Sequence, residues 1–161
     1  MLKRSLISLA LAIGMVSGVA QADIDKKTVD EVKALWEAQN KALDAHDVDG
    51  VMATFADSDD IMMMGTGPGE HWIGKEEIKD AYTHIMENFE AHTLKTECGE
   101  GKGASQGDVI WFTAVCTFTS GKDKSTVMNV SGVLLNQGGN LRFHTMHFSN
   151  LTGNPDAPAS K

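Results

Sequence analysis

The sequence predicts a single α+β domain in which three N-terminal helices pack on a curved, mainly antiparallel sheet of about five or six strands. Apolar residues recur at helical spacing up to residue 89, and runs rich in Thr, Val, Ile, Phe and Trp follow from residue 92. The length of 161 residues fits one hydrophobic core. Because such a sheet bends away from the helices that cover it, we expect a hollow between the two layers.

The first 22 residues are typical of a secretory signal peptide. Lys3 and Arg4 precede an apolar run over 6–19, which is shorter than the roughly 20 residues that cross a bilayer. Ala20-Gln21-Ala22 offers the small residues that a signal peptidase needs. We therefore expect a periplasmic or secreted chain with its domain over 23–152 and a disordered tail over 153–161. A retained N-terminal anchor is the alternative.

The charge balance excludes some classes of partner. The formal net charge is −8, which repels phosphate backbones and anionic headgroups. We expect no nucleic-acid partner and, after removal of the signal, no membrane partner.

Three helices follow from caps and apolar spacing. The capping-box spacing of Thr28 and Glu31 predicts a helix over 28–45. Asp47 predicts the start of a shorter helix that runs to Phe55. A third helix is expected from Gly74 to about residue 89, because its apolar residues repeat on one face and acidic residues occupy its first turn.

The remaining elements are strands. A short apolar run over 61–64 predicts the first strand, and the glycine-rich segment 65–69 predicts a loop. The further strands are expected near 92–100, 108–119, 125–136 and 140–150. Gly138 and Gly139 supply the turn of the last hairpin.

Cys98 and Cys116 are candidates for a disulfide, because an exported chain meets oxidising conditions. A hairpin centred near Gly107 would place them at facing positions. A slip of one residue would put them on opposite faces of the sheet, so a pair of buried thiols stays open as the alternative.

The order of elements and three local signatures resemble the SnoaL-like branch of the nuclear transport factor 2 (NTF2) superfamily, which includes ketosteroid isomerases. The signatures are Ala45-His46-Asp47-Val48-Asp49-Gly50, Gly74-Lys75-Glu76-Glu77-Ile78, and Leu141-Arg142-Phe143 with His147-Phe148-Ser149. The resemblance implies a cone-shaped, cystatin-like fold, a homodimer formed through the sheets and a ligand pocket inside the cone. It leaves the function open, because the superfamily includes isomerases, cyclases, dehydratases and domains without catalysis.

Proton-transfer chemistry in such a pocket needs a carboxylate or an imidazole in apolar surroundings. Asp60 begins the first strand beside three methionines, and Glu70 stands in the glycine-rich loop next to His71 and Trp72. Side chains alternate along the final strand, so His147 shares a face with Phe143, Thr145 and Ser149. The alternatives are a solvated turn for Asp60, an exposed loop for Glu70 and a core histidine for His147.

The expected pocket walls are aromatic or sulfur-containing side chains. They are Trp36, Met64, Trp72, Tyr82 and Trp111, and each would otherwise be plain core. Tyr82 is the only tyrosine and lies on a helix, so an oxyanion hole of strand tyrosines is excluded. We expect no cofactor.

A soft copper site is the remaining chemical idea, because an exported chain rich in Met and His carries suitable ligands. His144 and His147 point to opposite faces of a strand, and Met62 and Met63 diverge in the same way. We therefore expect no metal site and interpret the methionines as core residues.

The sequence thus predicts an exported domain that binds a small, largely apolar organic ligand in an internal cavity. Two classes remain open: cofactor-free isomerase, cyclase or dehydratase chemistry by proton transfer, and a non-catalytic ligand-binding or dimerisation module. Groups that titrate near neutrality would favour the enzyme, and a lining without a buried acid or base would favour the binding module.

Overall fold

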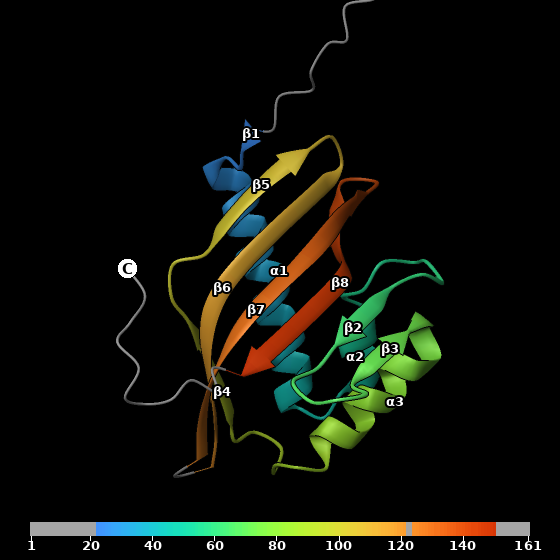
Figure 1. Cartoon of the computed structure of the whole chain (residues 1–161), viewed down its shortest axis with the longest axis vertical. Helices are drawn as coiled ribbons and strands as arrows, with labels where there is room; N and C mark the ends of the chain where they lie inside the picture. Colours follow the sequence, from blue (N-terminus) through green and yellow to red (C-terminus); the bar gives the residue numbers. More distant parts are fainter. Residues whose placement is uncertain (1–21, 122–123, 151–161) are drawn as a thin grey trace, which may run out of the picture.

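The computed structural model describes residues 22–121 and 124–150 (Figure 1). The predicted C-terminal tail and all but the last residue of the predicted signal peptide lie outside these ranges. None of the described helices combines the length and the apolar character that crossing a bilayer requires.

The first helix, α1, spans Lys26–Asp44 and begins slightly before the predicted position. Its N-cap is Asp25, whose carboxylate accepts a hydrogen bond from the Thr28 backbone N–H at 2.7 Å. The predicted capping box is wrong, because Thr28 lies inside the first turn and Glu31 pairs with Lys27. The aspartate three residues earlier satisfies the free amide instead.

The other two helices, α2 over Val48–Met52 and α3 over Gly74–Met86, end about three residues before their predicted ends. Asp47 caps α2 as predicted, accepting from the Gly50 backbone N–H at 2.9 Å. The helix α2 ends at Met52 because the backbone that follows it forms hydrogen bonds with Phe143 of the last strand. The Thr54 carbonyl accepts from the Phe143 N–H at 2.9 Å, and the Ala56 N–H donates to the Phe143 carbonyl at 2.8 Å.

The sheet of the described residues has eight strands in the order β1-β5-β6-β7-β8-β2-β3, with β4 pairing along the other end of β6. The bounds are β1 Ala22–Asp23, β2 Met62–Met64, β3 His71–Ile73, β4 Leu94–Cys98, β5 Lys102–Gln106, β6 Val109–Ser120, β7 Lys124–Gln137 and β8 Asn140–Asn150. Among the described strands only the β2–β8 pair is parallel, which confirms a mainly antiparallel sheet. The strand number exceeds the prediction because β1 and β5 contain no apolar run and β3 has only three residues soon after the glycine-rich loop.

A β-bulge in β8 changes which residues share a face. Thr145 pairs with Val133 and Phe143 pairs with Leu134, so His144 is the extra residue. Phe143 is therefore buried on the same side as Met146, and the predicted alternation that grouped Phe143 with His147 is wrong. His147 stays on the opposite side, across from Ser131.

The sheet consequently has two unlike faces. The covered face lies against α1, with α2 and α3 beside it (Figure 1), and it carries Phe112, Phe118, Val130, Phe143 and Met146. The opposite side, here called the open face, has no described element over it. Strand register places Trp111, Val115, Val127, Val133 and His147 on this side.

Candidate functional site

The space between α1 and the covered face is filled by a chain of aromatic rings. The Trp36 ring lies 6.3 Å from Phe118 and 6.4 Å from Phe143, measured between ring centroids. Phe55 lies 6.1 Å from Phe143, and Phe118 lies 6.3 Å from Phe148. These are normal packing distances for aromatic pairs. The region in which the sequence predicts a ligand therefore contains packed aromatic side chains.

One polar atom in this interior has no partner. The Tyr82 side chain projects from α3 into the core with 3% exposure, and its ring lies 6.0 Å from that of Phe55. Its hydroxyl forms no hydrogen bond within the described residues. Burial raises the pKa of the Tyr82 phenol, so this group stays protonated and can only donate or accept a hydrogen bond.

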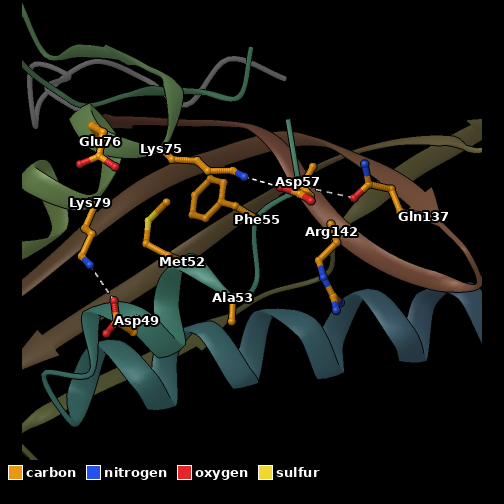
Figure 2. Close-up of a pocket in the computed structure, with 11 residues that line it drawn as sticks. Asp49, Met52, Ala53, Phe55, Asp57, Lys75, Glu76, Lys79, Gln137 and Arg142 are labelled. Atoms are coloured by element: carbon orange, nitrogen blue, oxygen red, sulfur yellow. Dashed lines mark hydrogen bonds and ion pairs between the residues drawn. The ribbon is translucent and has the colours of Figure 1, made fainter. Parts of the chain in front are cut away.

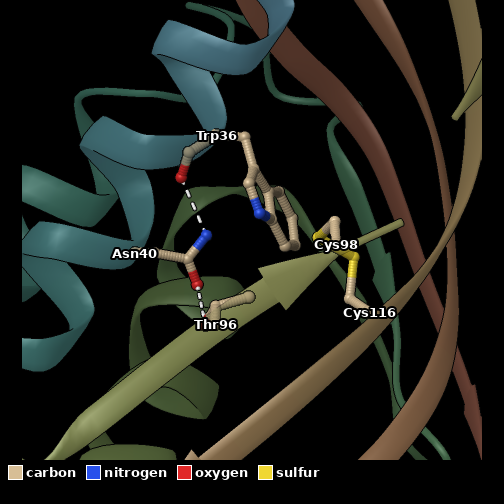
Figure 3. Close-up of a disulfide and its surroundings, with 5 residues drawn as sticks. All are labelled: Trp36, Asn40, Thr96, Cys98 and Cys116. Atoms are coloured by element: carbon tan, nitrogen blue, oxygen red, sulfur yellow. Dashed lines mark hydrogen bonds between the residues drawn. A yellow bond between two sulfur atoms is a disulfide. The ribbon is translucent and has the colours of Figure 1, made fainter. Parts of the chain in front are cut away.

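A disulfide closes one end of the same interior (Figure 3). Cys98 and Cys116 are direct partners in the β4–β6 register, and their sulfur atoms are bonded, which decides between the two alternatives that the sequence left open. Beside the disulfide, the Asn40 amide donates to the Trp36 carbonyl at 2.8 Å, and the Thr96 hydroxyl donates to the Asn40 amide oxygen at 2.9 Å. These contacts hold α1 against β4.

A pocket of about 430 Å³ opens between α2, the first turns of α3 and the β7–β8 hairpin (Figure 2). The pocket is half open to solvent. Its apolar lining consists of Met52, Ala53, Phe55 and Ala56. Its polar rim consists of Asp49, Asp57, Lys75, Glu76, Lys79, Gln137 and Arg142. The pocket therefore combines an apolar floor with charged groups of both signs.

Two ion pairs occupy the rim. Lys75 pairs with Asp57, and the Lys79 ammonium nitrogen lies 2.7 Å from an Asp49 carboxylate oxygen. Hydrogen bonding and charge attraction within these pairs lower the pKa of Asp57 and raise the pKa values of Lys75 and Lys79. Each shift moves the group away from neutrality, so these three groups stay ionised over the physiological range.

Arg142 differs from the two lysines. Its guanidinium donates to the Leu141 carbonyl at 2.9 Å and has no carboxylate partner within the described residues. Arg142 is partly buried on β8, and its side chain is one of those that line the pocket.

The three predicted catalytic residues do not line this pocket. Asp60 is 76% exposed, and its carboxylate accepts hydrogen bonds from the Ser58 hydroxyl and, at 3.2 Å, from His144. These two contacts lower the pKa of Asp60, whereas an apolar setting would have raised it. Asp60 is thus an ionised surface group at neutral pH.

Glu70 and His147 occupy two further places. The Glu70 carboxylate accepts from the backbone N–H groups of Thr66 at 2.5 Å and Gly67 at 2.8 Å, which closes the glycine-rich loop. His147 is partly buried on the open face, opposite Ser131 and Met64. The structure therefore does not bring the three predicted residues to one site.

The predicted pocket walls divide between the two faces. Trp36 and Tyr82 belong to the interior, and Trp72 packs against the same core from β3. Met64 and Trp111 lie on the open face.

Sequence reasoning missed the pocket of Figure 2, although a signal for it was present. Asp49, Lys75 and Arg142 each belong to a different one of the three signatures that carry the family resemblance. The fold brings these separate segments to one rim (Figure 2). Their convergence is visible only once the helices and the last hairpin are in place.

Comparison with known proteins agrees with this architecture. The sequence profile of the SnoaL-like domain matches residues 32–153. No curated protein matches the chain.

Solved structures share the fold at low identity. An NTF2-like protein of unknown function from Pseudomonas putida is 20% identical, with 78% of this chain and 88% of that chain covered and a TM-score of 0.67. A protein with a cystatin-like fold from Nostoc punctiforme is 18% identical, with 84% and 98% covered and a TM-score of 0.68. A candidate dehydratase of the NTF2-like family from Streptomyces avermitilis is 16% identical, with 79% and 98% covered and a TM-score of 0.67.

Proposed function

This chain belongs to the SnoaL-like domain family of the NTF2-like fold, and from that premise we propose that it is an exported binding module for a small organic molecule held in the pocket of Figure 2. The ligand has an apolar body and an anionic edge. The proposal depends on one observation. Arg142 is partly buried beside the apolar floor of the 430 Å³ pocket and has no carboxylate partner in the described residues.

The shape of the ligand follows from the lining. Met52 and Phe55 offer apolar contact area, and burial of such area favours binding in proportion to the surface removed from water. Arg142 offers paired N–H donors that match the two oxygens of a carboxylate or sulfonate. A small apolar molecule with one such group would contact the apolar floor and bind Arg142 at the same time.

Binding is favoured over proton-transfer catalysis because of the charged groups present. A general acid or base works best with a pKa near neutrality. The pKa of Asp57 is lowered and those of Lys75 and Lys79 are raised, so none of the three is suited to exchange a proton at neutral pH. Asp60, the first predicted catalyst, has a lowered pKa as well.

The binding proposal is tested with 8-anilinonaphthalene-1-sulfonate, an apolar fluorophore that carries one anionic group. Its affinity is measured for the wild type, Arg142→Gln and the control Lys102→Gln, which alters an exposed cation on β5 away from the pocket. A charged hydrogen bond contributes about 1.5–3 kcal/mol, so Arg142→Gln is expected to weaken binding roughly tenfold or more. Equal affinity for all three proteins would reject the proposed site.

Export is the second part of the proposal, supported by the signal-like N-terminus and by the disulfide between Cys98 and Cys116. The intact mass of the protein recovered from a periplasmic extract is expected to correspond to a chain beginning at Asp23. A mass that includes Met1 would contradict export with cleavage.

A homodimer formed through the open face is the third part. Val115 and Val127 project from the neighbouring strands β6 and β7 on this face with 47% and 42% exposure, and a partner sheet would remove both from water. Sedimentation velocity is expected to find a dimer for the wild type and a monomer for Val115→Glu. Ile85→Glu, on the exposed side of α3, is the matched control and should remain dimeric. A monomeric wild type would overturn this part.

A further inference from the structure

Three soft or nitrogen-containing side chains form a row across the open face near the edge of the sheet. Met64 of β2 is the direct register partner of His71 on β3 and of His147 on β8. Directly opposed residues in neighbouring strands project to the same side of a sheet, so the three side chains share one face. We call this set the His-Met-His row.

The row lies on β8, β2 and β3 toward one edge of the sheet, whereas the proposed dimer contact is centred on Val115 and Val127 of β6 and β7. The three side chains of the row are at least partly accessible and make no polar contacts within the described residues. Met64 is 44% exposed, His71 is exposed and His147 is partly buried. Within residues 22–121 and 124–150, neither of these two imidazoles has a hydrogen-bond partner or a carboxylate partner. Their ring nitrogens are therefore free to bind an external group.

The spacing of the strands suits one small cation. Adjacent strands are about 4.8 Å apart, so His71 and His147 start roughly 10 Å from each other with Met64 between them. If both imidazoles lean inward, their ring nitrogens come within reach of one cation above the Met64 thioether. A cation at that point would have two nitrogen ligands and one sulfur ligand.

The chemical nature of the three side chains indicates which metal ion they would bind. Thioether sulfur is a soft ligand that favours Cu(I), and imidazole also suits copper, whereas Mg²⁺ and Ca²⁺ require oxygen ligands. No group of three His, Cys, Asp or Glu residues in the described chain is placed to hold a metal. The row differs from such groups because methionine supplies its third ligand.

We propose that the His-Met-His row of His71, Met64 and His147 is a Cu(I)-binding site. It lies outside the pocket of Figure 2 and does not depend on the ligand proposed there. From the sequence alone we considered a copper site and expected none, because His71, Met64 and His147 are separated by 7 and 76 positions and are joined only by strand register.

The experiment is a competition titration of the full mature protein with the chromophoric complex of Cu(I) and bicinchoninate, under argon with ascorbate, which leaves disulfides intact. The wild type is expected to remove one equivalent of Cu(I). Met64→Leu and the double variant His71→Ala/His147→Ala are each expected to bind Cu(I) at least tenfold more weakly.

The matched control is Met62→Leu. Met62 lies on the same strand and the same face, but its register partners are Ile73 and Thr145, so it lacks flanking imidazoles. It should bind Cu(I) as the wild type does. X-ray absorption of the loaded wild type should show one sulfur and two nitrogen ligands, and far-UV circular dichroism should show that each variant is folded.

Three outcomes would overturn the proposal. They are a wild type that takes no Cu(I) from the competitor, a Met64→Leu variant that binds as tightly as the wild type, and a Met62→Leu variant that loses as much affinity as Met64→Leu. A monomeric protein that still binds Cu(I) would reject the proposed homodimer and leave the proposed copper site standing. The two proposals can therefore be tested independently.

Discussion

The two faces of the sheet are built from the same three long strands but have opposite contents. On the covered face, Phe118 and Phe143 pack against rings from α1 and the segment after α2, and Phe112 packs against Phe143. On the open face, valines, threonines and two histidines remain at least partly accessible. Stability therefore resides mainly in one face, and the other face is available for interaction. The pocket lies where the helices leave the covered face.

The contrast predicts a large difference between matched truncations. Phe143→Ala removes a fully buried ring that contacts Trp36, Phe55 and Phe112, so the free energy of unfolding should fall by about 3–5 kcal/mol. Val115→Ala on the open face should cost less than about 1 kcal/mol. Urea unfolding followed by tryptophan fluorescence measures both. Similar losses for the two variants would mean that the faces do not differ in this way.

The disulfide is the next largest expected contribution. The cysteines lie 18 positions apart, and constraining a loop of that size in the unfolded chain is worth about 3 kcal/mol. Cys98→Ser combined with Cys116→Ala should lower the free energy of unfolding by about this amount. Reduction of the wild type with dithiothreitol should give the same loss. If the reduced protein unfolds at the same urea concentration as the oxidised one, the disulfide does not stabilise the covered face.

Removal of the Tyr82 hydroxyl is expected to increase the free energy of unfolding, unlike the changes above. This buried hydroxyl lacks a partner, and an unsatisfied buried polar group costs about 1–3 kcal/mol. Tyr82→Phe is therefore expected to raise the free energy of unfolding by about 1 kcal/mol. Thermal unfolding without added ligand measures this change. A clear loss of stability would show that the hydroxyl is bonded in solution, to water or to a bound molecule.

The smallest expected effect is on pH dependence. Hydrogen bonds lower the folded-state pKa values of Asp25, Asp57 and Asp60 below the ordinary value of 3.8. A lowered folded-state pKa stabilises the protein fully above 3.8, and this contribution is lost as the pH falls through the lower folded-state values. The melting temperature should therefore decrease as the pH is lowered below about 4. Replacing all three by Asn should flatten this decline, and an unchanged decline would assign it to other groups.

Sequence reasoning succeeded where a signal is local. Helical spacing, the Asp47 cap and the long strands can all be recognised within short segments, and each is confirmed. The pairing of Cys98 with Cys116 stayed open in the sequence, and the structure shows the disulfide. Sequence reasoning failed where contacts with a segment far away in the chain decide the local structure. The end of α2 is set by hydrogen bonds to Phe143, and the faces of β8 are set by a bulge opposite β7. Neither partner is visible from the neighbouring residues.

By itself, the amino-acid sequence determined the fold class, the order of the long elements and the family, because these follow from periodic burial and from short motifs. Only the tertiary structure decided which residues meet. It brought Asp49, Lys75 and Arg142 to one rim and lined up His71, Met64 and His147 across three strands. The physical reason is that strand register and helix docking are set by contacts between residues far apart in the chain, and no local pattern encodes those distances.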